Sequence, residues 1–254
     1  MHKRDHSHSQ GKLFVVGIGP GNPLDRTIRA EQAVRASDVV AGYGRYLELI
    51  ADLLPDKEII SSGMTRERER CRLAIEAALG GARVSLVSSG DAGVYGMAGL
   101  ALEMIQKKEV SLDIEIIPGV SAAQAGAAEL GAPLMLDFAC VSLSDLLVDW
   151  EEIEKRLEAL AGADMVTVLY NPKSRKRTFQ IERTAQIFMN HRPGHTLVGI
   201  ARNASLPDQS IVLTDLGHML EKEMDMRTVV IIGNSRTKKA GPWMVTSRGY
   251  FEKT

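Results

Sequence analysis

Several predicted strands of this 254-residue chain run into loops that are rich in glycine and poor in charged side chains. The most prominent loop, Ser88–Gly96, reads Ser-Ser-Gly-Asp-Ala-Gly-Val-Tyr-Gly and follows the apolar run Val84–Val87. Open α/β sheets bind ligands at such places, beyond the carboxyl ends of the strands, where a helix follows the loop. Glycine lets the main chain approach a ligand closely and adopt positive φ. For any single loop, a plain tight turn is the alternative.

The first such loop, Gly17–Gly21, reads Gly-Ile-Gly-Pro-Gly and invites comparison with dinucleotide-binding turns. That fingerprint needs glycine or alanine at its sixth position, where this chain has Asn22. Pro20 removes a backbone donor that a pyrophosphate would use, and Asp38 lies at the start of the second strand rather than at its end. These departures disfavour a nicotinamide cofactor and a dehydrogenase.

Four further strand ends have the same character. They are Gly119–Ala122, Leu169–Pro172, Ala201–Asn203 and Asp225–Thr228. Together they favour a cleft that holds a phosphate-free ligand by carbonyls, a few amides and apolar walls.

Composition narrows the class of protein. A net charge of −1 argues against a broad nucleic-acid-binding surface, and 44% hydrophobic residues supply a substantial core. The cysteines, Cys71 and Cys140, have no metal-ligand spacing, so we expect reduced thiols, a cytoplasmic setting and no metal site. No run of about 18 apolar residues predicts a membrane span.

The N-terminus is polar and lacks the apolar segment of a signal peptide. Its histidines, His2, His6 and His8, could bind a stray metal ion, but a disordered tail over residues 1–11 is the expectation.

Hydrophobic periodicity predicts an α/β fold in which strands alternate with helices, as in parallel sheets. The expected strands are Leu13–Ile18, Asp38–Ala41, Glu58–Ser61, Val84–Val87, Ile114–Ile117, Ala139–Ser142, Met165–Tyr170, Leu197–Arg202, Ser210–Leu213 (paired with the strand before it) and Thr228–Ile232. The expected helices are Thr27–Ala36, one running through Leu54, Thr65–Leu79, Met97–Lys107, Val120–Leu130, Trp150–Leu160 and Thr178–Asn190. A boundary near Pro118 divides the chain into two α/β lobes, 12–118 and 119–236, with a cleft between them and a C-terminal extension over 237–254.

The ordered set of motifs resembles the tetrapyrrole (corrin/porphyrin) methylase family over about residues 12 to 236. The motifs are Gly17–Gly21, Ser89-Gly90-Asp91, Pro118-Gly-Val-Ser-Ala122, Tyr170-Asn171-Pro172 and Thr228–Gly233. The resemblance implies S-adenosylmethionine-dependent enzymes with two α/β lobes, usually homodimers, which bind the folded cofactor in the interlobe cleft.

Narrower features resemble one branch, the precorrin-3B or cobalt-factor III C17-methyltransferases of cobalamin synthesis. They include Gly42-Tyr43-x-x-Tyr46, Gly63-Met64-x-x-Glu67-x-x-Arg70, Leu130–Leu134, Ser142–Leu147 and Tyr170–Arg177. This branch usually reads Gly-His-Asp-Phe after the leucine, whereas this chain has Met135-Leu136-Asp137-Phe138. If that histidine contacts substrate or moves a proton, its absence alters the activity.

The resemblance assigns the cofactor contacts residue by residue. They are Gly19, Pro20, Ser89, Gly90, Asp91, Val94, Ser121, Ala122, Tyr170, Asn171, Ala201, Thr228 and Val229. Ser89, Gly90, Asp91 and Val94 would wrap the methionine and ribose parts. Main-chain groups at Ser121 and Ala122 would suit a carboxylate at the start of a helix. Asn171, Ala201 and Thr228 with Val229 would line the adenine pocket.

The acceptor implied by the resemblance is a macrocycle with many acetate and propionate groups, which arginine and lysine suit. The expected substrate contacts are Tyr43, Arg45, Met64, Arg70, Lys173 and Arg175, and the cationic clusters that would suit this acceptor are Arg66–Arg72 and Lys173–Arg177. A solvated, self-paired helix face is the alternative for Arg66–Arg72. The two tyrosines, Tyr43 and Tyr46, and the methionines could equally be packing residues.

Methylation with ring contraction also requires proton movement, for which Asp91, Tyr95 and Tyr43 are candidates. Asp91 is expected to order its loop or a bound cofactor rather than to act as a base. The function expected is C17 methylation of precorrin-3B or cobalt-factor III. The alternatives are another methylase of the family, such as a uroporphyrinogen or precorrin methylase or a diphthine synthase, and a non-catalytic tetrapyrrole-binding protein. The motifs are compatible with acceptors with or without cobalt.

Overall fold

A computed structural model describes residues 11–251 of the chain. The chain divides into two compact units, and the boundary between them along the sequence falls between Ser121 and Ala122. The predicted disordered tail lies outside the described residues except for Gly11, which is buried. Within residues 11–251, no helix has both the length and the apolar composition needed to cross a membrane.

The N-terminal unit is built on one five-stranded parallel sheet with the order β3-β2-β4-β1-β5. Its strands are β1 (Lys12–Gly17), β2 (Val39–Tyr43), β3 (Glu58–Ser62), β4 (Arg83–Ser88) and β5 (Asp113–Ile117). All five predicted strands are therefore confirmed, with ends that differ by a few residues. Because the strands are parallel, their carboxyl ends lie at one edge of the sheet.

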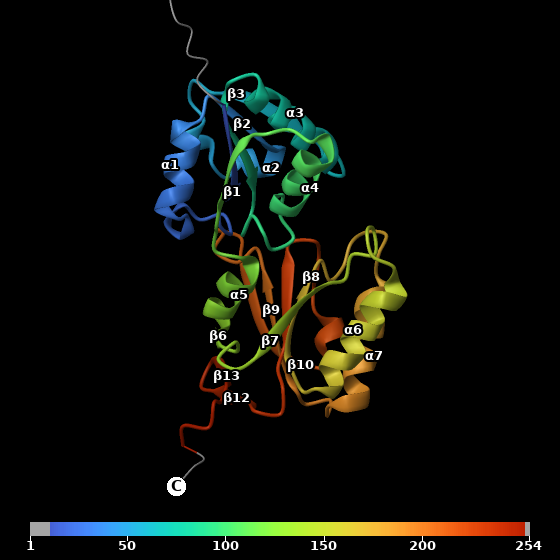
Figure 1. Cartoon of the computed structure of the whole chain (residues 1–254). Coiled ribbons are helices and arrows are strands. Elements are labelled where there is room, and N and C mark those ends of the chain that lie inside the picture. The colour runs from blue at the N-terminus through green and yellow to red at the C-terminus, as the bar shows by residue number, and fades with distance from the viewer. Residues whose placement is uncertain (1–10, 252–254) are drawn as a thin grey trace, which may run out of the picture. The chain divides into compact units, whose positions relative to one another are not determined.

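Helices cover both faces of this sheet (Figure 1). Helices α1 (Ile28–Ala36) and α2 (Gly44–Glu48) pack on one face, and α3 (Glu67–Leu79) and α4 (Ala98–Lys108) pack on the other. The chain leaves β1 toward one side of the sheet and β4 toward the other, which makes the point between these neighbouring strands a topological switch.

One predicted helix, the one running through Leu54, is wrong as a continuous element. The structure divides it into α2 and a 3-10 turn, Ala51–Leu53. Ile50 between them leaves the helical conformation, with φ −122° and ψ 22°, and its side chain is fully buried. Core packing therefore overrides local helix propensity at this point.

The C-terminal unit has a mixed sheet with the order β10-β9-β11-β8-β7. Its strands are β7 (Phe138–Ser142), β8 (Val166–Tyr170), β9 (Leu197–Arg202), β10 (Ser210–Asp215) and β11 (Thr228–Ile232). Only β7 and β8 pair in parallel, and the predicted pairing of β10 with β9 is confirmed as antiparallel. β11 also runs antiparallel to both its neighbours, which the alternation of strands and helices did not indicate.

Three helices cover this second sheet (Figure 1). Helix α5 (Ala122–Leu130) packs on one face, and α6 (Trp150–Gly162) and α7 (Phe179–His191) pack on the other. The alternating side chains of β11 serve both cores: Val229 and Ile231 face α5, whereas Val230 and Ile232 face α6 and α7.

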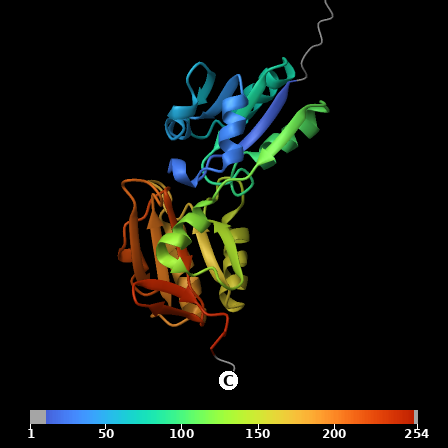
Figure 2. The same ribbon diagram turned by 90° about the vertical axis from the view of Figure 1, so that its left-hand side faces the viewer.

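The segment expected as an extension contains a hairpin that the sequence did not predict. Strands β12 (Thr237–Ala240) and β13 (Trp243–Thr246) pair antiparallel, and β13 pairs in parallel with the short strand β6 (Gly131–Ala132). Met244 is fully buried in the core beneath α5, so the hairpin (red in Figure 2) belongs to the C-terminal unit.

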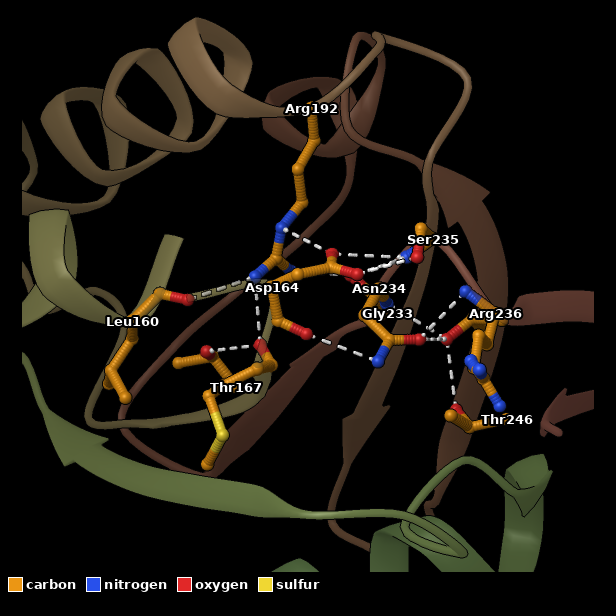
Figure 3. A network of polar contacts seen from close by, with 11 residues as sticks. Leu160, Asp164, Thr167, Arg192, Gly233, Asn234, Ser235, Arg236 and Thr246 are labelled. Atoms are coloured by element: carbon orange, nitrogen blue, oxygen red, sulfur yellow. Dashed lines mark hydrogen bonds and ion pairs between the residues drawn. The ribbon is translucent and has the colours of Figure 1, made fainter. Parts of the chain in front are cut away.

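Arg192, at the end of α7, is the centre of a buried polar network (Figure 3). Its Nη1 donates to the Gly233 carbonyl at 2.6 Å, and its Nη2 donates to the carbonyls of Leu160 (3.1 Å) and Met165 (2.9 Å). Burial lowers the pKa of this guanidinium, while the charge of Asp164, 3.6 Å away, raises it. Arg192 therefore joins the ends of α6, α7 and β11.

Candidate functional site

Three loops of the N-terminal unit meet at the carboxyl edge of its sheet: Gly17–Gly21 after β1, Ser88–Gly96 after β4, and the turn after β5 that contains Gly119. Gly19 and Gly90 form an antiparallel bridge. The Gly19 N–H donates to the Gly90 carbonyl at 3.1 Å, and the Gly90 N–H donates to the Gly19 carbonyl at 2.7 Å. The backbone of the two loops is therefore joined at the topological switch.

Glycine is required here because the loops touch backbone to backbone. A Cβ on Gly119 would lie 2.2 Å from the Gly90 carbonyl oxygen and 2.6 Å from the Gly17 carbonyl oxygen. A Cβ on Gly17 would lie 2.8 Å from the Gly119 nitrogen. These contacts leave no room for a side chain, and the atoms in the way are backbone atoms that cannot rotate aside.

Asp91 fixes the shape of this loop assembly. Its Oδ1 accepts hydrogen bonds from the amides of Gly93 (2.7 Å) and Val94 (3.1 Å), and its Oδ2 accepts one from the amide of Gly119 (3.0 Å). The expectation that Asp91 orders its loop is confirmed. Since backbone amides engage both carboxylate oxygens, Asp91 is the least available of the three candidates for proton transfer.

The other two candidates for proton transfer differ in exposure. Tyr95 has a left-handed backbone, with φ 54°, and its side chain is 53% exposed. Tyr43 is half-buried at the end of β2, and its ring meets that of Tyr46 edge to face with 5.3 Å between centroids.

The expected substrate residues of this unit divide by burial. Arg45 and Met64 are exposed, whereas Arg70 is 3% exposed. Within the predicted cationic cluster, Arg66 pairs with Glu69 at 3.3 Å and Arg72 pairs with Glu76 at 2.6 Å. The self-paired helix face therefore describes those two arginines, and Arg70 is a separate case.

The expected cofactor residues of the C-terminal unit lie at one edge of its sheet. Strand pairing places Val229 opposite Ala201 and Thr228 opposite Arg202, and the antiparallel pairing of β11 with β8 brings Tyr170 and Asn171 to the same edge. Ala201 and Val229 are 2% and 5% exposed. Both residues are therefore buried at this edge of the sheet.

The first turn of α5 is partly occupied by a protein group. The Ala123 N–H donates to the Tyr170 hydroxyl oxygen at 3.0 Å. Ser121 is buried and Ala122 is half-buried at the start of this helix. Of the expected residues, Tyr170 thus contacts the helix terminus directly, which sequence spacing did not indicate.

Asn171 is held by Ser142, which was not among the expected site residues, and by Arg177, which was expected only as part of the cationic cluster for the substrate. Its Nδ2 donates to the Ser142 Oγ at 2.9 Å, and its carbonyl oxygen accepts from the Arg177 Nη2 at 2.6 Å. Asn171 has φ 51°, a left-handed conformation that asparagine tolerates. Lys173 is half-buried and Arg175 is exposed, so Arg177 is the cation of this loop that contacts an expected site residue.

Two neutral buried polar atoms at these edges lack a hydrogen-bond partner within residues 11–251. They are the Ser88 Oγ, at the end of β4, and the Asn203 Oδ1, directly after β9. Both groups are neutral. The Nε of Arg70 and the Nε of Arg177 also lack a partner in this part of the chain, so the two edges offer neutral hydroxyl and amide groups together with two guanidinium groups.

One described cavity lies elsewhere, at the opposite edge of the second sheet. It has a volume of about 370 Å³ and is lined by residues around Arg192, including Asp164, His191 and His195. Because the guanidinium there is bonded to structural carbonyls, this cavity does not resemble the predicted cofactor site.

Comparison with known proteins identifies the class. A model of the tetrapyrrole (corrin/porphyrin) methylases matches residues 12–220, and the chain belongs to this family.

Two individual proteins also resemble the chain along most of its length. The chain is 44% identical over 238 residues to a probable cobalt-factor III C(17)-methyltransferase of Salmonella typhimurium, covering 94% of this chain and 99% of that protein. It is 46% identical over 248 residues to the cobalt-factor III methyltransferase of Priestia megaterium, covering 96% of this chain. In that case the chain spans only 46% of the relative's length.

Solved structures agree with the fold. The methyltransferase CobJ superposes with a TM-score of 0.88 at 35% identity, covering 93% of this chain and 100% of that chain. A uroporphyrin-III C-methyltransferase from Thermus thermophilus, complexed with S-adenosylhomocysteine, has a TM-score of 0.69 at 23% identity, covering 88% and 97%.

Proposed function

We propose that this chain is an S-adenosylmethionine-dependent C-methyltransferase of corrin biosynthesis, which methylates precorrin-3B or cobalt-factor III at C17 with ring contraction. The observation that carries the proposal is the match to the Salmonella protein, which extends over 99% of that protein. The glycine-rich, bare-backbone loops at the edge of the N-terminal sheet are consistent with it.

The cofactor residues that we propose belong to both units. In the N-terminal unit they are Gly19, Pro20, Ser89, Gly90, Asp91, Val94 and Ser121, and in the C-terminal unit they are Ala122, Tyr170, Asn171, Ala201, Thr228 and Val229. We propose that the two sets face a common cleft between lobes 12–118 and 119–236, with the segment 237–254 outside it.

S-adenosylmethionine supplies a methyl group that is already activated on a sulfonium centre. The protein must therefore align donor and acceptor and exclude water, and it needs no protein nucleophile. The rigid loop assembly around Asp91 suits this task, because its three backbone hydrogen bonds limit rearrangement when a ligand binds. The proposed acceptor contacts are Tyr43, Arg45, Met64, Arg70, Lys173 and Arg175.

The test is to incubate purified protein with precorrin-3B and with cobalt-factor III in parallel, using a labelled methyl donor. We expect one additional methyl group on one or both acceptors, detected by mass spectrometry. A product from uroporphyrinogen or from another precorrin alone would instead indicate a different methylase of the family. Bound cofactor with no transfer to any acceptor would indicate the non-catalytic tetrapyrrole-binding alternative, which only the Met135-Leu136 departure favours.

An equilibrium titration checks the cofactor separately. We expect S-adenosylhomocysteine to bind, and Asp91→Ala to weaken that binding because Gly93, Val94 and Gly119 lose their common acceptor. Absence of binding at millimolar ligand would refute the proposed cofactor, and unchanged affinity in the variant would refute the placement of the site.

We also propose an oligomeric state and a location for the protein. The family resemblance suggests a homodimer, which sedimentation equilibrium would measure directly. A cytoplasmic location fits the two free cysteines, Cys71 and Cys140; burial raises the pKa of the Cys71 thiol to about 11, which makes it unreactive.

A further inference from the structure

Arg70 is a buried cation for which residues 11–251 provide no carboxylate partner. It lies in the first turns of α3 and is 3% exposed. Its Nη1 donates to the Ser62 Oγ at 2.7 Å and makes a contact of 3.5 Å with the Gly63 carbonyl. Its Nη2 has only the Met97 sulfur, at 4.0 Å, and its Nε has no hydrogen-bond partner.

The other two buried arginines among the described residues have both carbonyl acceptors and a carboxylate nearby. Arg26 makes a bidentate pair with Asp52, at 3.0 Å for both contacts, and also donates to the Leu49 carbonyl. Arg192 donates to three carbonyls and lies 3.6 Å from Asp164. Arg70 is thus the exception among the three described buried arginines, with one good neutral acceptor for five N–H donors.

Such an arrangement is unfavourable for the folded chain alone. Removing a charge from water has a large cost, which only a counter-ion or a full set of hydrogen bonds offsets. A thioether is a weak acceptor, and the contact with Gly63 is at the limit of hydrogen-bonding distance. An anion that supplied two oxygens would satisfy the free donors bidentately.

The location of Arg70 connects it with the proposed site. Ser62 ends β3, and Met97 directly follows the Ser88–Gly96 loop. β3 is parallel to β2, and β2 is parallel to β4. Arg70 therefore lies at the carboxyl edge of the N-terminal sheet, the edge that carries the joined glycine loops. Gly63 is exposed, so an anion that took the place of the Gly63 carbonyl beside the Arg70 guanidinium would approach from solvent.

We infer that Arg70 binds a carboxylate of the substrate, an acetate or propionate side chain of a polycarboxylate tetrapyrrole. This inference rests on the proposed function and specifies it: Arg70 selects the acidic acceptor and takes no part in holding the cofactor. The exposed arginines of the same helix are not required for this role.

The test compares Arg70→Met, Arg70→Lys and the matched control Arg68→Met, which changes an exposed arginine two residues away. Uroporphyrin III serves as the polycarboxylate probe, and its dissociation constant and that of S-adenosylhomocysteine are measured by titration. We expect Arg70→Met to weaken porphyrin binding about ten- to a hundredfold, since it loses hydrogen bonds to a charged group. We expect the affinity for S-adenosylhomocysteine to stay within about twofold, partial rescue by lysine, and little effect of Arg68→Met.

Urea unfolding distinguishes this role from a purely structural one, because replacing a structural arginine would lower the urea concentration at the unfolding midpoint. A buried charge without a counter-ion destabilises the free protein, so Arg70→Met should unfold at the same urea concentration as the wild type or at a higher one. A marked fall in the unfolding midpoint would show that Arg70 is structural and would overturn the inference.

The binding results separate this inference from the proposed function. If the wild type binds both ligands and Arg70→Met binds porphyrin equally well, the inference is overturned and the function stands. If the wild type binds S-adenosylhomocysteine but no tetrapyrrole, the substrate assignment and the inference fall together while the cofactor stands. If it binds neither, the proposed function itself is refuted, and the inference with it.

Discussion

The conformation of Asn171, a proposed cofactor contact, is set by its neighbours. Its left-handed backbone turns the chain directly after β8, its amide is held by Ser142, and its carbonyl is held by Arg177. Among the described residues the buried Arg177 Nε has no hydrogen-bond partner, and burial lowers the pKa of this guanidinium. Arg177 is therefore a positioning residue for Asn171, at a cost in desolvation.

The first prediction concerns this pair. Arg177→Gln should weaken S-adenosylhomocysteine binding about tenfold, because it removes a charge-assisted hydrogen bond to the Asn171 carbonyl. The control Arg175→Gln changes an exposed neighbour and should leave the dissociation constant unchanged. Isothermal titration of both variants decides the point, and equal effects would mean that only the net charge of the loop matters.

Part of this arrangement could be predicted from the sequence. That Asp91 orders its loop could be predicted, since it is the only carboxylate among glycines and small residues. That its second oxygen reaches Gly119 could not, because the contact depends on β1, β4 and β5 lying side by side. The bracing of Asn171 by Ser142 has the same origin, since β7 and β8 are separated in sequence by α6.

At the scale of elements, sequence patterns predicted strands better than their directions. The ranges of β9 and β11 are confirmed residue for residue. Strand direction could not be predicted in the same way. A buried apolar run such as Thr228–Ile232 has the same sequence pattern whether its neighbours are parallel or antiparallel to it. The β12–β13 hairpin was missed because its first strand is mostly exposed and lysine-rich.

The second prediction tests the contact between the glycine loops. Gly119→Ala should destabilise the protein by roughly 3 kcal/mol or more, since its Cβ would meet two backbone carbonyl oxygens. Gly99→Ala is the matched control, because Gly99 lies in α4 with nothing within 4 Å of a Cβ. That variant should gain about 0.5 to 1 kcal/mol from helix propensity. Urea unfolding measures both, and similar midpoints would contradict the contact.

The third prediction concerns the network of Figure 3. Arg192→Met leaves the carbonyls of Leu160, Met165 and Gly233 without this donor and should lower the free energy of unfolding by about 3 kcal/mol or more. Arg156→Met removes an exposed ion pair with Glu152 and should change it by less than about 0.5 kcal/mol. Arg192→Met also serves as the reference for Arg70→Met, since equal losses in the two would mean that both arginines are structural.

At the scale of the whole molecule, each unit has its own buried cores. Two clusters in the N-terminal unit lie on opposite faces of the parallel sheet, and two in the C-terminal unit lie on opposite faces of the mixed sheet. The proposed cofactor contacts are divided between these units. A ligand that binds both should therefore stabilise both at once.

The fourth prediction follows from this division. At S-adenosylhomocysteine concentrations about a hundred times its dissociation constant, stabilisation should reach about 2.7 kcal/mol. Hydrogen exchange followed by mass spectrometry should show slower exchange in segment 88–96 and also in segments 169–172 and 200–203. Helices α6 and α7, which pack on the face opposite α5, serve as internal controls. Protection confined to one unit would contradict a site shared by both.

The strand order of the N-terminal unit also has a consequence during synthesis of the chain. β1 is the second strand from the edge and pairs only with β4 and β5, both of which leave the ribosome long after it. Until then, a strand whose Leu13, Val15 and Val16 become fully buried is unpaired along its whole length. A nascent chain stalled before β4 should therefore bind chaperones through this segment, and one extended well past Ile117 should release them.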